Sequence, residues 1–207
     1  MGKYFMAIIV TGLLLSSCCP TVSVNPLSPP AGFDERLEGA WKYDPEEGEK
    51  VYLHIGKASD STMTVHLVEH KKDGELNIVD FSFFLTKTGM NNYLNIKIED
   101  IEKDISEDCK GYVFVKYIFT DNETLHFYSI SVENEPVISA IETNRLKGKL
   151  KYGEKILHKG EESEGAKSEK EIDCVIITDT PENMINFFDS DKDNKIFSEE
   201  LKFTRIK

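Results

Sequence analysis

The clearest folding signal in the chain is the stretch Leu76-Asn-Ile-Val-Asp-Phe-Ser-Phe-Phe-Leu-Thr-Lys87. Its apolar side chains recur at every second position, and polar side chains stand beside them. Residues two apart share one face of a strand, so this pattern predicts a strand with one buried face. The apolar set is Val79, Phe81, Phe83 and Leu85, and the polar set is Asp80, Ser82 and Thr86.

Six further runs rich in Val, Ile, Phe and Tyr precede or follow that stretch. They cover residues 38–43, 51–55, 63–70, 93–99, 112–120 and 125–131. Turn signals such as Lys72-Asp-Gly74, Gly89-Met-Asn-Asn92 and Asp121-Asn122 separate several of them. Strands joined by such short connections pair as antiparallel hairpins. The predicted fold is mainly β, an antiparallel up-and-down barrel or curled sheet, in one domain over residues 34–207.

The last third of the chain is predicted to be more mixed. We expect a short helix over 136–144, a polar mobile loop over 159–171 and a strand over 174–178. A short helix should begin at Pro181, because Thr180 is a good N-cap residue and proline is favoured in the first turn. Alternation over 201–206 predicts a final strand.

Leu37-Glu-Gly39-Ala-Trp41 opens the first predicted strand, and its Gly-x-Trp pattern resembles the entry motif of the lipocalins. Thr120-Asp121 falls in the hairpin where lipocalins carry Thr-Asp-Tyr, although Asn122 replaces the tyrosine. The resemblance implies an eight-stranded barrel whose closed end is plugged by Trp41. It also implies that Arg205, on the last strand, makes a cation–π contact with Trp41. The helix-like segment and polar loop of the last third depart from the family pattern.

The N-terminus reads as a secretory signal peptide over residues 1–17. Lys3 supplies a positive charge and Tyr4–Leu15 an apolar stretch that is too short for a stable membrane span. The sequence Leu15-Ser-Ser-Cys18 resembles the bacterial lipobox, which implies lipidation of Cys18. Cys19, rather than an acidic residue, follows; by resemblance to the sorting rule of Gram-negative lipoproteins, this favours the outer membrane. The expected location is therefore the bacterial cell envelope, with the membrane contacted through the lipid on Cys18.

Residues 18–33 are predicted to be the lipidated cysteine and a proline-rich tether. This segment contains four prolines, Pro20, Pro26, Pro29 and Pro30, and proline favours extended, solvated chain. At about 3.1 Å per residue, such a tether would hold the domain roughly 40 Å from its anchor.

The chain carries a formal net charge of −12. Nucleic-acid binding requires clustered Lys and Arg side chains, so this acidic composition argues against a nucleic-acid partner. Cys109 and Cys174 are the two cysteines of the predicted domain. An exported compartment permits a disulfide between them, and two buried thiols are the alternative.

Asp189-Ser-Asp191-Lys-Asp193-Asn-Lys195-Ile-Phe-Ser-Glu-Glu200 resembles an EF-hand calcium loop. Carboxylates at Asp189, Asp191, Asp193 and Glu200 occupy ligand places of that loop. Asn194 replaces the glycine of the sharp turn, and Phe197 removes a coordinating side chain. The alternative is a polar turn between a helix and the last strand, which fits the strand-like residues after 200 better.

No catalytic motif stands out. His66 and His70 lie on one strand face about 13 Å apart and would need other strands to share an ion. His54 and His126 are predicted to be strand-surface residues. The sequence therefore predicts a non-enzymatic envelope lipoprotein that binds an envelope protein or a small hydrophobic ligand, with no cofactor. The alternatives are a lipocalin-like carrier, a calcium-binding lipoprotein and an envelope hydrolase.

Overall fold

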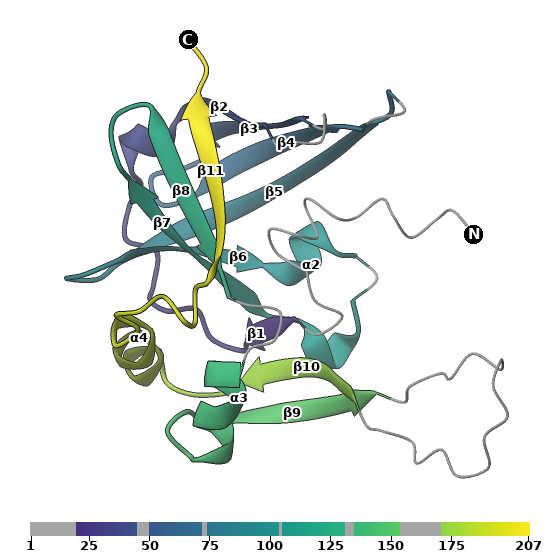
Figure 1. Ribbon diagram of the computed structural model, residues 1–207, viewed down its shortest axis with the longest axis vertical. Helices are drawn as coiled ribbons and strands as arrows, with labels where there is room; N and C mark the ends of the chain where they lie inside the picture. The colour runs from purple at the N-terminus through teal and green to yellow at the C-terminus, as the bar shows by residue number, and fades with distance from the viewer. Residues whose placement is uncertain (1–19, 45–49, 72–73, 104, 131–134, 154–170) are drawn as a thin grey trace, which may run out of the picture.

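The computed structural model describes residues 20–44, 50–71, 74–103, 105–130, 135–153 and 171–207. Its centre is a closed antiparallel barrel of eight strands (Figure 1). The predicted mainly β class, with a barrel and a short helix before the last strand, is confirmed. The barrel strands are β2 (Gly39–Tyr43), β3 (Lys50–Lys57), β4 (Met63–His70), β5 (Leu76–Lys87), β6 (Asn92–Lys97), β7 (Tyr112–Phe119), β8 (Thr124–Ser129) and β11 (Glu199–Arg205).

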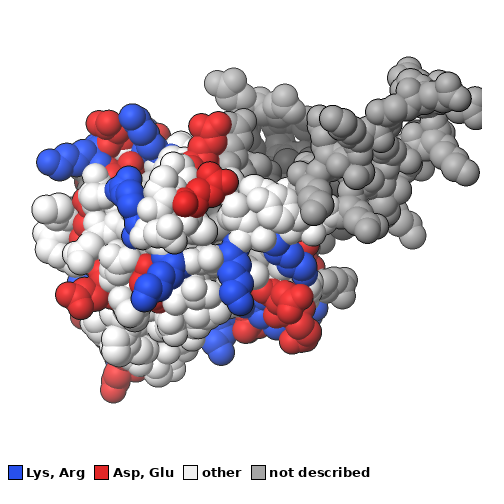
Figure 2. Space-filling model, turned by 90° about the horizontal axis from the view of Figure 1, so that it is seen from below, with Lys and Arg blue, Asp and Glu red and all other residues white. Residues whose placement is uncertain are grey.

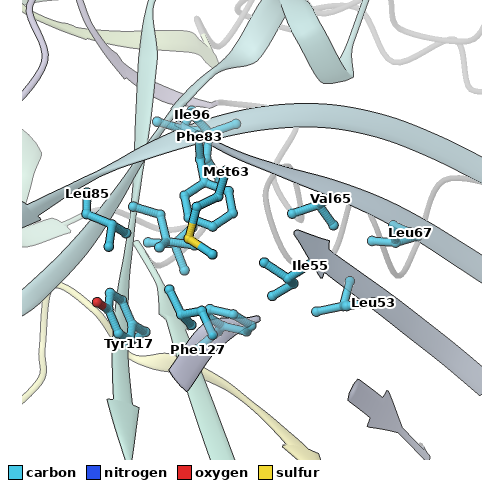
Figure 3. Close-up of a cluster of buried hydrophobic side chains, with 14 of the residues drawn as sticks. Leu53, Ile55, Met63, Val65, Leu67, Phe83, Leu85, Ile96, Tyr117 and Phe127 are labelled. Carbon is cyan, nitrogen blue, oxygen red and sulfur yellow. The ribbon is translucent and has the colours of Figure 1, made fainter. Parts of the chain in front are cut away.

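Each barrel strand turns alternate side chains inward, as the sequence pattern predicts. Phe83 and Leu85 are buried, and Val79 and Phe81 pack against the same core from its edge. Figure 3 shows the inward side chains of several strands pointing toward one another. Burial of this apolar surface is the main force that closes the barrel.

A second layer is inserted between β8 and β11. It contains α3 (Glu135–Glu142), β9 (Gly148–Gly153), β10 (Glu171–Ile177) and α4 (Pro181–Asp189). In Figure 1 these elements lie below and beside the barrel. Tyr93 and Phe114 contribute to a second core with Phe188, whose ring centroid lies 5.7 Å from that of Phe114.

Several local predictions for this part of the chain are confirmed. The helix predicted over 136–144 is α3, and the strand predicted over 174–178 is β10. α4 begins at Pro181, and the hydroxyl of Thr180 accepts a hydrogen bond from the Asn183 amide at 3.3 Å. The polar loop predicted over 159–171 lies outside the described residues except for Glu171.

The proline-rich segment after residue 19 differs from the expected solvated tether. β1 (Thr21–Ser23) pairs in parallel with β10 and also contacts β7. Val22 and Leu27 are fully buried, and the Leu27 amide donates to Asn95 Oδ1 at 2.9 Å. These apolar side chains gain more from burial than from solvation, so the segment belongs to the folded domain. Cys18 and residues 1–17 lie outside the described residues.

Three short helical segments were not predicted. They are η1 (Glu35–Leu37), α2 (Ile98–Ile101) and η2 (Glu107–Cys109). The strand predicted over 93–99 therefore ends at Lys97, and α2 begins at the next residue, Ile98. Among the described residues, no helix is both long enough and apolar enough to cross a membrane.

Candidate functional site

Arg205 and Trp41 lie side by side on β11 and β2, at one end of the barrel. The guanidinium of Arg205 lies 4.3 Å from the centroid of the Trp41 ring, which confirms the predicted cation–π contact. Arg205 also donates to the carbonyls of Glu38 and Asn122, at 2.8 and 3.3 Å. Gly39 has a φ of 131°, and a Cβ at that position would lie 2.8 Å from Arg205 Nη1. Glycine is therefore required in the Gly-x-Trp pattern.

A buried carboxylate completes this closed end. Asp34 accepts two hydrogen bonds from the Arg36 guanidinium, at 3.0 and 2.7 Å, and one from the Tyr117 hydroxyl at 3.2 Å. Burial alone would raise the pKa of Asp34, but the hydrogen bonds and charge of Arg36 hold it below its ordinary value. Lys87, 3.9 Å from the carboxylate, acts in the same direction. These contacts give Asp34 a structural role.

The barrel interior is filled by side chains. Figure 3 shows Phe83, Phe127 and Met63 close to one another in the buried cluster. The inward side chains, among them Leu53, Phe83 and Phe127, line an apolar cavity of about 30 Å³. A small molecule bound inside a protein needs a pocket of roughly 300–1,000 Å³, so this cavity is too small for one.

The four carboxylates of the EF-hand-like loop, residues 189–200, are not brought together. Asp189 accepts hydrogen bonds from Asn91 and Tyr93, both at 2.8 Å. Glu200 instead bonds His126 and Tyr128 on the outside of the barrel. Among the described residues, no group of three or more His, Cys, Asp or Glu side chains is arranged to hold a metal ion. The geometry favours the polar turn that the sequence offered as the alternative.

Asp191 organises this turn. Its carboxylate accepts from the amides of Lys195 and Ile196, both at 2.8 Å, and from that of Phe197 at 3.3 Å. Asn194 has a φ of 51°, as expected where it replaces the glycine of a sharp turn. The turn thereby places Ile196 and Phe197 in the second core.

Cys109 and Cys174 are both buried, and no disulfide joins them in the described part of the chain. Lys151 lies opposite Cys174 in the β9–β10 ladder, and its ammonium is 4.0 Å from Cys109 Sγ. The structure therefore shows buried thiols, the alternative that the sequence left open.

The outer face of β3, β4 and β5 is the candidate functional surface. Strand register places one residue from each strand side by side, which creates four parallel rows. We call this surface the β3–β5 face. Its rows are Gly56, Thr64 and Ser82; His54, His66 and Asp80; Tyr52, Val68 and Ile78; and Lys50, His70 and Leu76.

Two rows of the β3–β5 face carry its distinctive chemistry. In the histidine row, His66 Nδ1 lies 2.7 Å from Asp80 Oδ1, with both side chains exposed. In the next row, Ile78 is 61% exposed although it is a large apolar residue. Tyr52 and Val68 of the same row are half-buried, so the row is a partly exposed apolar strip beside polar side chains, a combination that contact surfaces often carry.

A groove of about 420 Å³ runs along one edge of this face. His66 and Asp80 form part of one wall, and Glu99, Asp100 and Lys103 come from α2 and the residues after it. On another side of the molecule, Figure 2 shows basic and acidic side chains interspersed.

The histidine row was missed because each histidine was considered on its own strand. His66 and His70 share a strand, whereas His54 and His66 lie on different strands at directly opposed positions. The turn signal Lys72-Asp-Gly74 was sufficient to predict the pairing of His66 with Asp80. A hairpin centred on residue 73 places His66 opposite Asp80, as observed.

Comparison with known proteins finds no matching family model, curated protein or solved structure.

Proposed function

We propose that this chain is a lipid-anchored protein of the bacterial cell envelope, located at the outer membrane, whose lipocalin-like barrel binds a protein partner through its outer surface. The anchor is Cys18, on the basis of Leu15-Ser-Ser-Cys18 and the signal sequence before it. The observation that carries the binding assignment is the filled interior, which leaves a cavity of only about 30 Å³.

The filled interior favours a partner-binding function over a carrier function, the two binding functions considered from the sequence. A carrier of a small hydrophobic ligand needs an enclosed cavity of several hundred Å³. Here the positions that would line it, including Phe83 and Phe127, pack against one another. Small barrels commonly fill their interior in this way, and recognition then depends on the outside of the barrel.

The β3–β5 face is the proposed contact surface. Tyr52, Val68 and Ile78 form an apolar row that a partner would remove from water. His54, His66 and Asp80 beside them supply polar groups that give such a contact its specificity.

Metabolic labelling with an alkyne fatty acid tests the anchor. Wild-type protein should carry the label, Cys18→Ala should lose it, and the matched variant Cys19→Ala should retain it. Equal labelling of Cys18→Ala and wild type would overturn the lipid assignment.

Native mass spectrometry and site-specific photo-crosslinking test the binding assignment. The purified protein should carry no co-purifying hydrophobic molecule. A photoreactive residue at Ile78 should crosslink one envelope protein in cells, whereas the same residue at Ile118, which is exposed on β7, should not. A stoichiometric lipid in the purified protein, or equal crosslinking from both positions, would contradict the proposal.

A further inference from the structure

We propose that His54 and His66 bind a divalent transition-metal ion such as Zn²⁺, Ni²⁺ or Cu²⁺, with Asp80 orienting His66. This site lies on the β3–β5 face, which is also the proposed partner contact, but metal binding by the purified protein is measured without the partner and does not depend on the lipid anchor. It rests on the placement of two imidazoles and one carboxylate in a single row across three strands.

The register places the two histidines side by side on neighbouring strands. His54 and His66 are directly opposed in the β3–β4 ladder, and residues opposed in this way have Cβ atoms about 4.5–5.5 Å apart. Both side chains point outward and are exposed, so they can rotate toward a common point above the sheet. A metal bound there would take each imidazole nitrogen at about 2.0–2.1 Å, the usual zinc–histidine distance.

Asp80 orients the His66 ring, the second proposed ligand. Its Oδ1 lies 2.7 Å from His66 Nδ1, so a proton on Nδ1 is donated to the carboxylate. The other ring nitrogen, Nε2, then carries the lone pair that binds metal. A carboxylate that bonds the far nitrogen of a ligating histidine is a recurrent arrangement around protein-bound metals.

The chain holds a matched comparison in His126. This histidine also bonds a carboxylate through Nδ1, that of Glu200. Its cross-strand neighbours, however, are Ile118 and Lys202, which are not metal ligands in this setting. A histidine–carboxylate pair alone therefore does not make the site, and the second opposed histidine is the distinguishing feature.

The site supplies two protein ligands and is open to solvent. Water would complete the coordination sphere, as in sites that keep open positions. Imidazole ligands suit Zn²⁺, Cu²⁺ and Ni²⁺ and disfavour Mg²⁺ and Ca²⁺, which prefer oxygen.

Isothermal titration of the full chain in detergent with Zn²⁺, repeated with Ni²⁺, tests the proposal. Wild-type protein should bind one ion, and His54→Ala or His66→Ala should each weaken binding at least tenfold. Asp80→Asn should weaken it about 10- to 100-fold, the usual effect of removing such a carboxylate. His126→Ala and His70→Ala should bind as wild type does, and Mg²⁺ should not compete.

Circular dichroism melting should show that His54→Ala and His66→Ala fold normally, because both side chains are exposed. Nuclear magnetic resonance then gives a second readout, in which Zn²⁺ should shift the ring signals of His54 and His66 but not those of His126. Binding that survives both substitutions, or the absence of binding at millimolar Zn²⁺, would overturn the proposal.

Discussion

Arg205 and Trp41 join the end of the barrel's last strand to the beginning of its first. The Arg205 guanidinium lies 4.3 Å from the Trp41 ring, and these two residues are also direct partners in the β11–β2 ladder. The first and last strands of the barrel, β2 and β11, are thus held together by a side-chain contact as well as by backbone hydrogen bonds.

Replacing Arg205 should measurably weaken the closure. Arg205→Lys keeps the positive charge but loses the planar group that donates to three backbone carbonyls. We expect a loss of about 2 kcal/mol in the free energy of unfolding, measured by urea denaturation. Lys202→Ala, at an exposed position on the same strand, should change it by less than about 0.5 kcal/mol. Equal midpoints for the two variants would contradict this role.

Val22 and Val24 test whether the proline-rich segment is part of the fold. Val22 is fully buried, whereas Val24 is 50% exposed. Val22→Ala should lower the free energy of unfolding by about 2 kcal/mol, because it removes buried methyl groups and leaves a cavity. Val24→Ala should have almost no effect. If both changes were neutral, a solvated tether would be the better description.

Asp191 and Asp193 distinguish a polar turn from a calcium site. In buffer with a calcium chelator, Asp191→Ala should lower the free energy of unfolding by about 2 kcal/mol, because three backbone amides lose their acceptor. Asp193→Ala should be almost neutral, since the ion pair of this exposed side chain with Lys195, at 3.6 Å, lies on the surface and is screened by solvent. A stabilising effect of Ca²⁺ on wild type, lost in both variants and not reproduced by Mg²⁺, would support the calcium site.

The small interior cavity should tolerate one added methylene group. Val65 lines the cavity, so Val65→Ile should leave the thermal midpoint unchanged or raise it slightly. Val51 is equally interior but does not line the cavity, and Val51→Ile should cost about 1–3 kcal/mol through overpacking. An equal loss of stability in Val65→Ile and Val51→Ile would show that the cavity cannot accommodate an added methylene group.

Asp34 should make the fold sensitive to acid. Its pKa in the folded state lies below the ordinary value of 3.8, so its stabilising effect is complete above that pH. The effect is lost as pH falls through the lowered pKa, because protonation removes the charge that Arg36 and Lys87 face. Asp34→Asn should be less stable at pH 7 and should lose less stability than wild type on acidification. Asp60→Asn is the exposed comparison: Lys57 lowers the pKa of Asp60 as well, but solvent screens this surface pair, so its effect on the pH profile should be much smaller.

Most barrel strands could be predicted from the alternation of apolar and polar residues, because inward and outward positions differ sharply in polarity along strands such as 76–87. The same reasoning failed for β1 and β9. The three residues of β1 follow a proline and precede three more, and Gly148–Gly153 has only Leu150 and Tyr152 as apolar residues. Both become strands because β10 lies between them and satisfies their backbone groups, a tertiary effect with no local signal.

The candidate site was predictable only in part. The turn at 72–74 fixes the pairing of His66 with Asp80, but the pairing of His54 with His66 depends on the hairpin at 58–62. There the backbone amides of Ala58 and Ser59 bond the Thr62 carbonyl, at 2.9 and 3.0 Å. No Asn-Gly or Asp-Gly dipeptide marks that turn, so the register was not readable from sequence.

The packing of β1 changes what a lipid on Cys18 would do mechanically. Pro20 follows Cys18 by two residues, a span of at most about 7.6 Å between Cα atoms, and its carbonyl accepts the Val175 amide at 3.0 Å. A lipid attached there would hold the barrel close to the bilayer, because so short a link allows little movement away from it. The barrel could rotate about the attachment point, but the side that carries β1 would stay next to the lipid headgroups. The fold itself would then determine which surfaces a neighbour in the envelope can reach.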